Sequence, residues 1–210
     1  MKILYFWDAY CGWCYGFDAI FKDFYVNHTD IPLEMISGGL FVGDRVKNIG
    51  DFTHFKQANQ QISDIYGVTF GEGYQASMNS RAFDLDSSGP ATAFAILRDK
   101  ITPQHLADLA YAIQEQFFIH GKDLSDATTY GPVAQSFNLD PDQMIQEITE
   151  AMQTSDLAHD DFIKTYQMGI QSYPTVVLQI NDQYYDLRGN ATTVEQLETI
   201  FSRIIEVSQS

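Results

Sequence analysis

Strand-like segments stand at the two ends of this 210-residue chain, and this placement limits how the chain can fold. Near the start, ILYFW (3–7) has the composition of a short buried strand, and PLEMISGGL (32–40) predicts a second strand. Near the end, TVVLQI (175–180) and QYYDL (183–187) flank a two-residue hairpin turn signal. Neither end could fold alone, because each has only half a sheet. We therefore expect the two ends to form one sheet.

Helical signals dominate the chain between these ends. Pro103, after a threonine cap, opens a segment whose apolar residues share one helical face. Asp140-Pro141 repeats the pattern before another such segment. We expect residues 41–165 to form an all-helical insertion, and residues 1–40 and 166–210 to form one discontinuous domain.

Two further helices are expected beside the strands. Apolar residues from Phe17 to Phe24 fall at helical spacing, so a helix should follow the first strand. Thr192 and Glu195 have the spacing of a capping box and predict the start of an amphipathic last helix. The expected order is β-α-β, a helical insertion and β-β-α, which is an α/β fold class.

Composition and charge exclude several classes of partner. Hydrophobic residues make up 45% of the chain, enough for a sizeable core, and the formal net charge is −16. Such a field repels phosphate backbones, so we expect no nucleic-acid partner and no anionic membrane surface.

The apolar run ILYFW is shorter than the roughly 7 to 15 residues of a secretory signal core, and a cytoplasmic location is expected.

The two cysteines of the chain, Cys11 and Cys14, lie in FWDAYCGWCYGF (6–17), where a strand ends and a helix begins. A disulfide between them would close a very short loop and stabilise the fold by about 2 kcal/mol at best. Two buried, reduced cysteines would leave the spacing unexplained. Structural zinc needs four ligands, and none of the five histidines lies three to five residues from another, so we expect no metal.

Redox chemistry explains the cysteine spacing better. A helix N-terminus carries a partial positive charge and free N–H groups, which favour a thiolate on the first cysteine. In C-x-x-C the second sulfur lies within one helical turn and can attack the first. Cys11 is therefore the expected nucleophile and Cys14 the expected resolving thiol.

Tyr173-Pro174 stands immediately before the predicted strand at 175–180. Proline in a sheet is confined to the first residue, an edge or a bulge. A proline in this place is a candidate for a cis peptide bond. A cis bond would turn the backbone of Tyr173 outward, where it could pair with an extended substrate.

These motifs together carry a family resemblance. CGWC on a strand-to-helix turn, with a distant YPT before a hairpin and a last helix, resembles the thioredoxin superfamily. The helical insertion resembles the DsbA family, and SGGLFVGDR (37–45), FGEGY (70–74) and GIQSYPT (169–175) are similar to a bacterial subgroup of predicted protein-disulfide isomerases. The resemblance implies a thioredoxin-like fold with a large all-helical insertion. It also implies that Cys11 and Cys14 form the redox pair.

The resemblance places further residues at the site. Pro174 takes the position of the cis proline that faces the redox pair, and Tyr173 takes the substrate-facing position before it. The dipeptide Gly12-Trp13 differs from the Pro-His of the strongly oxidising periplasmic members.

Three interpretations stay open. Asp8 either relays the proton of Cys14 or is a polar residue that closes the strand. Trp13 either faces the substrate or packs against the insertion. A set of aromatic residues either lines a groove beside the cysteines or belongs to the core. This set comprises Phe41, Phe70, Tyr74, Phe83, Phe117 and Phe118.

The expected function is that of a cytosolic thiol–disulfide oxidoreductase, acting as a reductase or isomerase. Its partner would be a protein with a disulfide or dithiol, or a small-molecule thiol. We expect no bound cofactor, with glutathione as a candidate co-substrate. One alternative is a protease adaptor with a thioredoxin fold, which would hold a client on its surface and whose cysteines would be sensors or have no role. Another is a kappa-class glutathione transferase or hydroxychromene carboxylate isomerase, but such enzymes generally have a serine where Cys11 stands.

Overall fold

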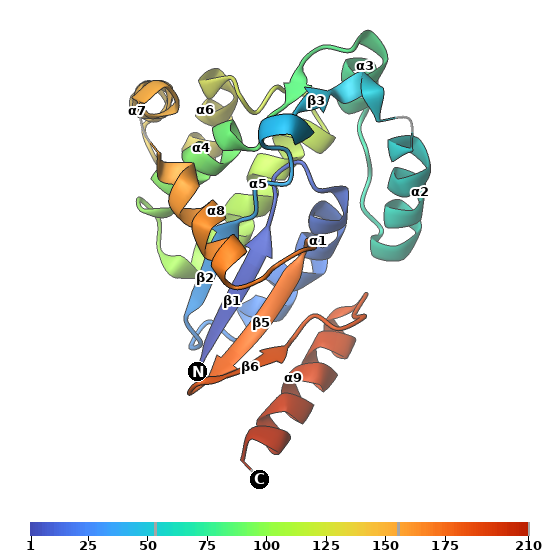
Figure 1. Ribbon diagram of the computed structural model, residues 1–210, viewed down its shortest axis with the longest axis vertical. Coiled ribbons are helices and arrows are strands. Elements are labelled where there is room, and N and C mark those ends of the chain that lie inside the picture. The colour runs from blue at the N-terminus through green and yellow to red at the C-terminus, as the bar shows by residue number, and fades with distance from the viewer. Residues whose placement is uncertain (53, 155, 210) are drawn as a thin grey trace.

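The computed structural model describes residues 1–52, 54–154 and 156–209. Figure 1 shows a four-stranded sheet in the order β2-β1-β5-β6. The strands are β1 (Lys2–Trp7), β2 (Leu33–Ser37), β5 (Thr175–Ile180) and β6 (Gln183–Asp186). β1 lies parallel to β2 and antiparallel to β5, with Tyr5 opposite both Met35 and Val176. The prediction that the two ends form one sheet is confirmed.

Side chains of β1 alternate between two cores on opposite faces of the sheet. Ile3, Tyr5 and Trp7 belong to the large core, which also includes residues of α1 (Gly12–Val26), the insertion and α9 (Val194–Ser208). Leu4 and Phe6 belong to a small cluster on the other face. That face is covered by α8 (Leu157–Gln167), which contacts β2, and by the segment that follows α8 (Figure 1). Alternation with period 2 thus buries both sides of β1.

The insertion is mainly helical and shares the large core with the sheet. Besides α8, its helices are α2 (Phe55–Tyr66), α3 (Glu72–Ser80), α4 (Ser88–Arg98), α5 (Leu106–Phe118), α6 (Tyr130–Ser136) and α7 (Pro141–Thr154). Short 3₁₀ helices are formed by Gly43–Arg45, Ile49–Asp51, Pro103–His105 and Ala127–Thr129. Tyr15 of α1 stacks on Tyr111 and Phe118 of α5, with ring centroids 5.4 and 4.8 Å away. These contacts fasten the insertion to α1.

Three details differ from the sequence predictions. The insertion is not all-helical, because β3 (Lys47–Asn48) and β4 (Asp84–Leu85) form a separate two-stranded ribbon. Strands of two residues are too short to show an alternating pattern. The last helix is capped one residue later than predicted, by Thr193, whose side chain accepts from the N–H of Gln196. The predicted domain boundary at residue 165 falls inside α8.

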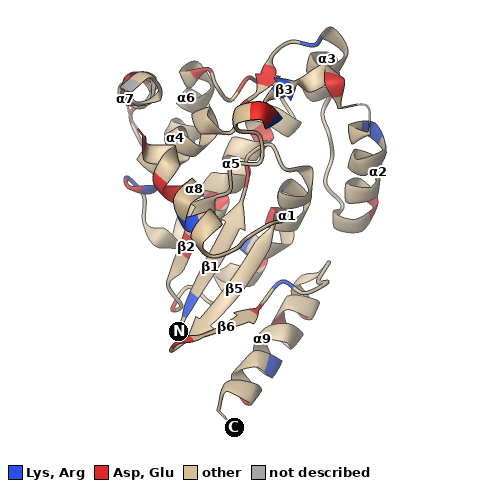
Figure 2. Cartoon of the chain, in the orientation of Figure 1, with Lys and Arg blue, Asp and Glu red and all other residues tan. Residues whose placement is uncertain are grey.

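The predicted cap at Asp140 is confirmed, since its carboxylate accepts from the N–H of Gln143 at 3.0 Å. Figure 2 shows acidic residues scattered along the chain, on α2, α3, α8 and α9 among other elements. Within the described ranges, no helix is long and apolar enough to cross a membrane.

A bidentate ion pair fixes α8 and α4 to the end of β2. Both terminal nitrogens of Arg98 donate to the carboxylate of Asp161, at 2.7 and 3.1 Å. The same carboxylate accepts from the N–H of Ser37 at 2.9 Å, and Arg98 also donates to the carbonyl of Met35. Asp161 is buried. The pair therefore holds the residues just before the Gly38-Gly39 turn in place.

We predict that Asp161→Ala lowers the free energy of unfolding by about 3 kcal/mol, because it leaves a largely buried guanidinium unpaired. Urea denaturation monitored by circular dichroism measures the change. The control is Asp160→Ala, an exposed position on the same helix, for which a change within about 0.5 kcal/mol is expected. Equal effects of the two substitutions would contradict the proposed role of the ion pair.

Candidate active site

The two cysteines occupy the N-terminus of α1. Cys11 is the N-cap residue, and its sulfur accepts a hydrogen bond from the backbone N–H of Cys14 at 3.3 Å. Both are free thiols; Cys14 is fully buried, whereas Cys11 retains 6% of its surface exposed. Burial raises the pKa of the Cys14 thiol well above its ordinary value, and the neighbouring Cys11 and Asp18 raise it further. Cys11 thus keeps a small exposed surface and its sulfur receives a helix N–H, while Cys14 is fully enclosed.

Tyr173 and Pro174 lie beside Cys11, although they are more than 160 residues away in sequence. The Tyr173–Pro174 peptide bond is cis, and the thiol of Cys11 donates to the carbonyl oxygen of Tyr173 at 3.6 Å. The Tyr173 side chain points elsewhere, because its hydroxyl donates to the carbonyl of Gly38 at 2.5 Å. Its ring covers Gly38 so closely that a Cβ there would lie 2.2 Å from it. The backbone of Tyr173, rather than its side chain, therefore faces the thiol.

Asp8 is buried at the end of β1, and both of its carboxylate oxygens are engaged. Oδ1 accepts from the N–H of Tyr10 at 3.0 Å, and Oδ2 accepts from the N–H of Leu40 at 2.7 Å. Burial raises the pKa of Asp8, while these N–H groups and the hydroxyl of Ser87 act in the opposite direction. These bonds fit the interpretation of a polar residue that closes the strand; the proton-relay role of Asp8 stays a prediction.

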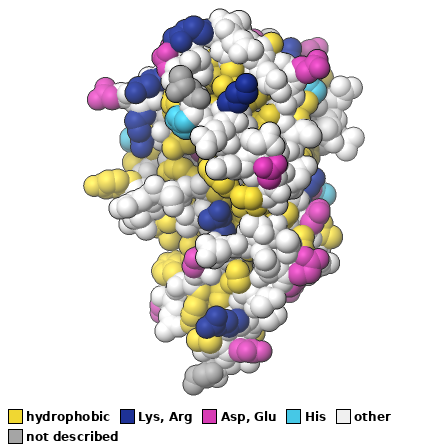
Figure 3. Space-filling model, turned by 90° about the vertical axis from the view of Figure 1, so that its right-hand side faces the viewer, with side chains coloured by type: hydrophobic (Ala, Val, Ile, Leu, Met, Phe, Trp, Pro, Cys, Tyr) yellow, Lys and Arg dark blue, Asp and Glu magenta, His cyan; other side chains and the backbone are white. Residues whose placement is uncertain are grey.

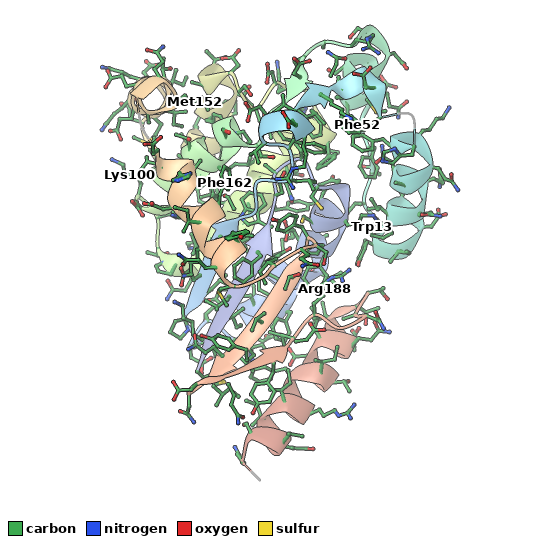
Figure 4. All side chains as sticks on the ribbon, viewed as in Figure 1. Trp13, Phe52, Lys100, Met152, Phe162 and Arg188 are labelled. Carbon is green, nitrogen blue, oxygen red and sulfur yellow. The ribbon has the colours of Figure 1, made fainter. Side chains whose placement is uncertain are left out.

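A small, mainly apolar cavity of about 140 Å³ opens beside Cys11. Trp13 lines it from the side of α1 that faces α2 (Figure 4), and Phe55 lines it from α2. Trp13 is half-buried and packs on the large core. The remaining lining residues are Tyr10, Gly12, Leu40, Phe41, His54, Ala58, Asn59, Ile62, Tyr74 and Phe118. Figure 3 shows hydrophobic side chains across the middle of the molecular face on which α2 lies.

The aromatic set predicted from the sequence divides between the cavity and the core. Phe41, Tyr74 and Phe118 line the cavity, whereas Phe117 is fully buried in the core. Phe70 and Phe83 pack on the core without lining the cavity. Tyr10 and the residues of α2 were missed by the sequence analysis. The aromatic run Phe52, His54, Phe55 was a visible signal for this part of the wall.

Two glycines allow α2 to lie directly on α1. A Cβ at Gly12 would lie 3.1 Å from Cδ1 of Ile62. A Cβ at Gly16, one turn later, would lie 2.5 Å from the ring of Tyr66 and 2.7 Å from Cγ2 of Ile62. The glycine between the cysteines is therefore part of a helix–helix contact.

Asp18 is a second buried acid that the sequence analysis did not single out. It lies one turn after Cys14 on α1, is 1% exposed, and accepts a hydrogen bond on Oδ1 from the hydroxyl of Tyr5. Burial raises the pKa of Asp18 to about 8, although Tyr5, Gln114 and the charge of Lys22 act to lower it. Its place between Phe17 and Phe21, on the apolar face of the helix, was the signal that could have identified it.

Among the residues that the structure describes, no group of three or more His, Cys, Asp or Glu side chains could hold a metal ion. The groups that the structure brings together here are the two thiols, the Tyr173 backbone and the nearby acids.

Comparison with known proteins supports the fold. No protein-family model and no curated protein sequence matches the chain. The cytosolic disulfide reductase DsbM from Pseudomonas aeruginosa is similar in structure, with a TM-score of 0.80 at 16% identity over 99% of this chain and 100% of the other. A protein from Nitrosomonas europaea assigned as a protein disulfide isomerase has a TM-score of 0.78 at 17% identity, over 98% of each chain.

A third structure has a different activity in its name. A 2-hydroxychromene-2-carboxylate isomerase superposes with a TM-score of 0.64 at 11% identity, over 100% of this chain and 97% of the other. The resemblance to DsbA-like proteins is thus confirmed at the level of fold, which is a thioredoxin-like fold with a large insertion. Because the same fold also occurs in an isomerase, the choice of chemistry depends on the side chains of the site.

We predict that Gly16→Ala lowers the free energy of unfolding by about 1–2 kcal/mol, because the new methyl group displaces the ring of Tyr66. The steric cost of about 2–3 kcal/mol outweighs the gain of about 1 kcal/mol that alanine brings to a helix interior. Gly12→Ala is the comparison variant. The nearest contact of its new methyl group is the flexible end of the Ile62 side chain, so it should lower the free energy of unfolding by less. Urea denaturation measures both, and a greater loss for Gly12→Ala would contradict this packing.

We also predict that the Asp18 carboxyl makes stability depend on pH. Its pKa of about 8 lies above the value of about 3.9 in an unfolded chain, so the fold favours the protonated form. The stability gained from this is fully present below pH ~4 and is lost as pH rises through about 8. Relative to wild type, Asp18→Asn should therefore become more stable between pH 5 and pH 8.5. Asp23→Asn, an exposed acid on the same helix, should show no such trend.

Proposed function

We propose that this protein is a thiol–disulfide oxidoreductase that reduces disulfides, with Cys11 as nucleophile and Cys14 as resolving thiol. One observation carries the proposal. The Cys11 sulfur caps a helix, receives the N–H of Cys14 and faces the carbonyl of Tyr173 next to a proline. The helix N-terminus and the N–H of Cys14 stabilise negative charge on the Cys11 sulfur, whereas the Tyr173 carbonyl accepts from the protonated thiol, and the C-x-x-C spacing keeps the second sulfur within one helical turn of the first.

The reaction then follows two exchanges. The Cys11 thiolate attacks one sulfur of the substrate disulfide, forms a mixed disulfide and releases the other substrate sulfur as a thiolate. Cys14 loses its proton and attacks the Cys11 sulfur, which releases the second substrate thiolate. The substrate gains two electrons, and the protein is left with a Cys11–Cys14 disulfide. A small thiol or a dithiol protein restores the reduced protein by the reverse steps.

The site also suggests how a substrate is held. Tyr173 precedes the β5 ladder, so an extended segment beside Cys11 could pair with its backbone. The adjoining cavity, with Trp13 and Phe55 in its wall, fits one apolar side chain next to the attacked cysteine. The roles of Trp13, Tyr173 and Pro174 in substrate binding belong to this proposal.

Glutathione is the proposed co-substrate, and no bound cofactor takes part. One similar structure is the Pseudomonas DsbM with GSH. That protein is described as cytosolic, and we propose a cytoplasmic location here too, where thiols are kept reduced. A disulfide-containing protein or a small disulfide is the proposed partner.

A redox titration tests the proposal. Wild-type protein is equilibrated with glutathione or dithiothreitol buffers, and its free thiols are counted by mass. We expect a reversible two-electron transition near about −270 mV, the region of reducing thioredoxin-type dithiols. Cys11→Ser should abolish disulfide reduction, and Cys14→Ser should trap the mixed disulfide.

Two outcomes would contradict the proposal. Turnover that persists in Cys11→Ser, or the absence of a Cys11–Cys14 disulfide at every potential, would remove the dithiol from the function. A client protein still bound by the double Cys→Ser variant would then indicate an adaptor. Glutathione-dependent isomerisation in that variant would instead indicate an enzyme of the hydroxychromene carboxylate isomerase type.

A further inference from the structure

The resolving step requires a proton acceptor that the thiol pair itself does not provide. Cys14 is fully buried, and its burial raises the pKa of the thiol. A thiol must lose its proton before it can attack a disulfide. A group within the protein must therefore take the proton of Cys14 when Cys11 is bound to substrate.

Asp8 is poorly arranged for this task, and Asp18 is well arranged. Both oxygens of Asp8 accept backbone N–H groups outside α1. Asp18 uses only Oδ1, for the hydroxyl of Tyr5, whereas its Oδ2 is buried and has no hydrogen-bond partner among the residues described. The buried side-chain amide of Gln114 lies near this carboxylate and acts to lower its pKa, although the two groups form no well-aligned hydrogen bond. A carboxylate oxygen without a well-aligned hydrogen bond is thus enclosed one helical turn from Cys14.

The position of Asp18 on the helix also connects Cys14 with the surface. Cys14, Asp18 and Lys22 are four residues apart, so their side chains follow one another along one face of α1. The ammonium group of Lys22 lies 4.3 Å from the ring centre of Tyr111. Lys22, Tyr111 and Glu115 line an open groove of about 770 Å³. This groove does not include either cysteine and is separate from the cavity beside Cys11.

The titratable groups around Asp18 come from three elements. Tyr5 faces it from β1, Cys14 and Lys22 from α1, and Tyr111 from α5. Of these, Lys22 is the group whose positive charge favours ionised Asp18. The pKa of about 8 lies close to neutrality, where an acid–base group exchanges protons most effectively.

We propose that Asp18 is the proton acceptor of Cys14 in the resolving step, and that the proton leaves along α1 toward the groove at Lys22. This inference rests on the dithiol function proposed above. The Sγ–H bond of Cys14 breaks as its proton moves to Oδ2 of Asp18, and the sulfur electron pair forms the bond to Cys11. The Cys11–substrate bond breaks, and its electron pair leaves with the substrate sulfur. When a thiol reduces the Cys11–Cys14 disulfide, neutral Asp18 returns the proton to Cys14.

Stopped-flow reaction with 5,5′-dithiobis(2-nitrobenzoate) separates the two steps. The attack of Cys11 releases one nitrothiobenzoate at a rate proportional to the reagent concentration. The attack of Cys14 releases the second at a rate independent of that concentration. Both rates are measured between pH 5.5 and 9.5 for wild type, Asp18→Asn and the exposed control Asp23→Asn.

We expect Asp18→Asn to slow the second release about 100-fold near pH 7 and to remove its inflection near pH 8. The first release should change by less than about twofold, and Asp23→Asn should match wild type in both phases. If the second release in Asp18→Asn keeps the wild-type rate and pH profile, the inference is overturned. Equal slowing of both phases would also overturn it, because that pattern indicates a structural role.

A surface variant keeps the test decisive if Asp18→Asn does not fold. Lys22→Gln removes the positive charge that lowers the pKa of Asp18, so the inflection should move to higher pH. Lys100→Gln is the control. Lys100 lines the same groove but is not among the groups that act on Asp18, so this substitution should leave the inflection at its wild-type pH. An unmoved inflection in Lys22→Gln contradicts the inference. Failure to release any nitrothiobenzoate would instead contradict the dithiol function itself.

Discussion

The antiparallel register between β1 and β5 is the constraint on which the site depends. Phe6 lies opposite Thr175, so the turn that follows β1 meets the residues that precede β5. The Cys11 sulfur is 3.6 Å from the carbonyl oxygen of Tyr173, and each residue of a strand advances by about 3.3 Å. A shift of one residue would therefore separate them. The shift is opposed because Val176 and Leu178 enter the large core while Val177 faces the small cluster.

Helix α1 positions several parts of the site at once. Its N-terminus holds the two sulfurs, one face presents Gly12 and Gly16 to α2, and another face buries Asp18 against β1 and α5. Because a helix repeats every 3.6 residues, these faces are fixed relative to one another. The thiols, the cavity wall and the buried acid are consequently positioned by a single rigid element.

Much of this arrangement could be predicted from local sequence signals. The strands, the hairpin turn, the cysteine pair and the proline before β5 each have a short-range signature, and strand pairing followed from the need of each end to bury half a sheet. The remainder depends on contacts between distant elements. Ile62 and Tyr66 show no local sign that they rest on Gly12 and Gly16.

Contacts that local sequence signals do not show also explain why the surroundings of the two buried acids and the exact cap of α9 were not predicted. Asp8 and Asp18 both look like polar residues beside apolar runs, but their hydrogen-bond partners lie on other parts of the fold, such as Leu40 for Asp8 and Tyr5 for Asp18. Thr193 caps α9, while the hydroxyl and the N–H of Thr192 both donate to the side-chain oxygen of Gln196. Sequence spacing alone does not show which of two adjacent threonines caps a helix, because that depends on the local backbone geometry.

The contact of Gly12 with Ile62 has an evolutionary consequence. A Cβ at position 12 would already crowd the end of the Ile62 side chain, so a larger residue there needs a smaller residue at position 62 for α2 to keep its place. The two positions are therefore expected to vary together among relatives, although 50 residues separate them. Position 13, whose side chain lines the cavity, is free of this coupling and is where natural variation between the cysteines should concentrate.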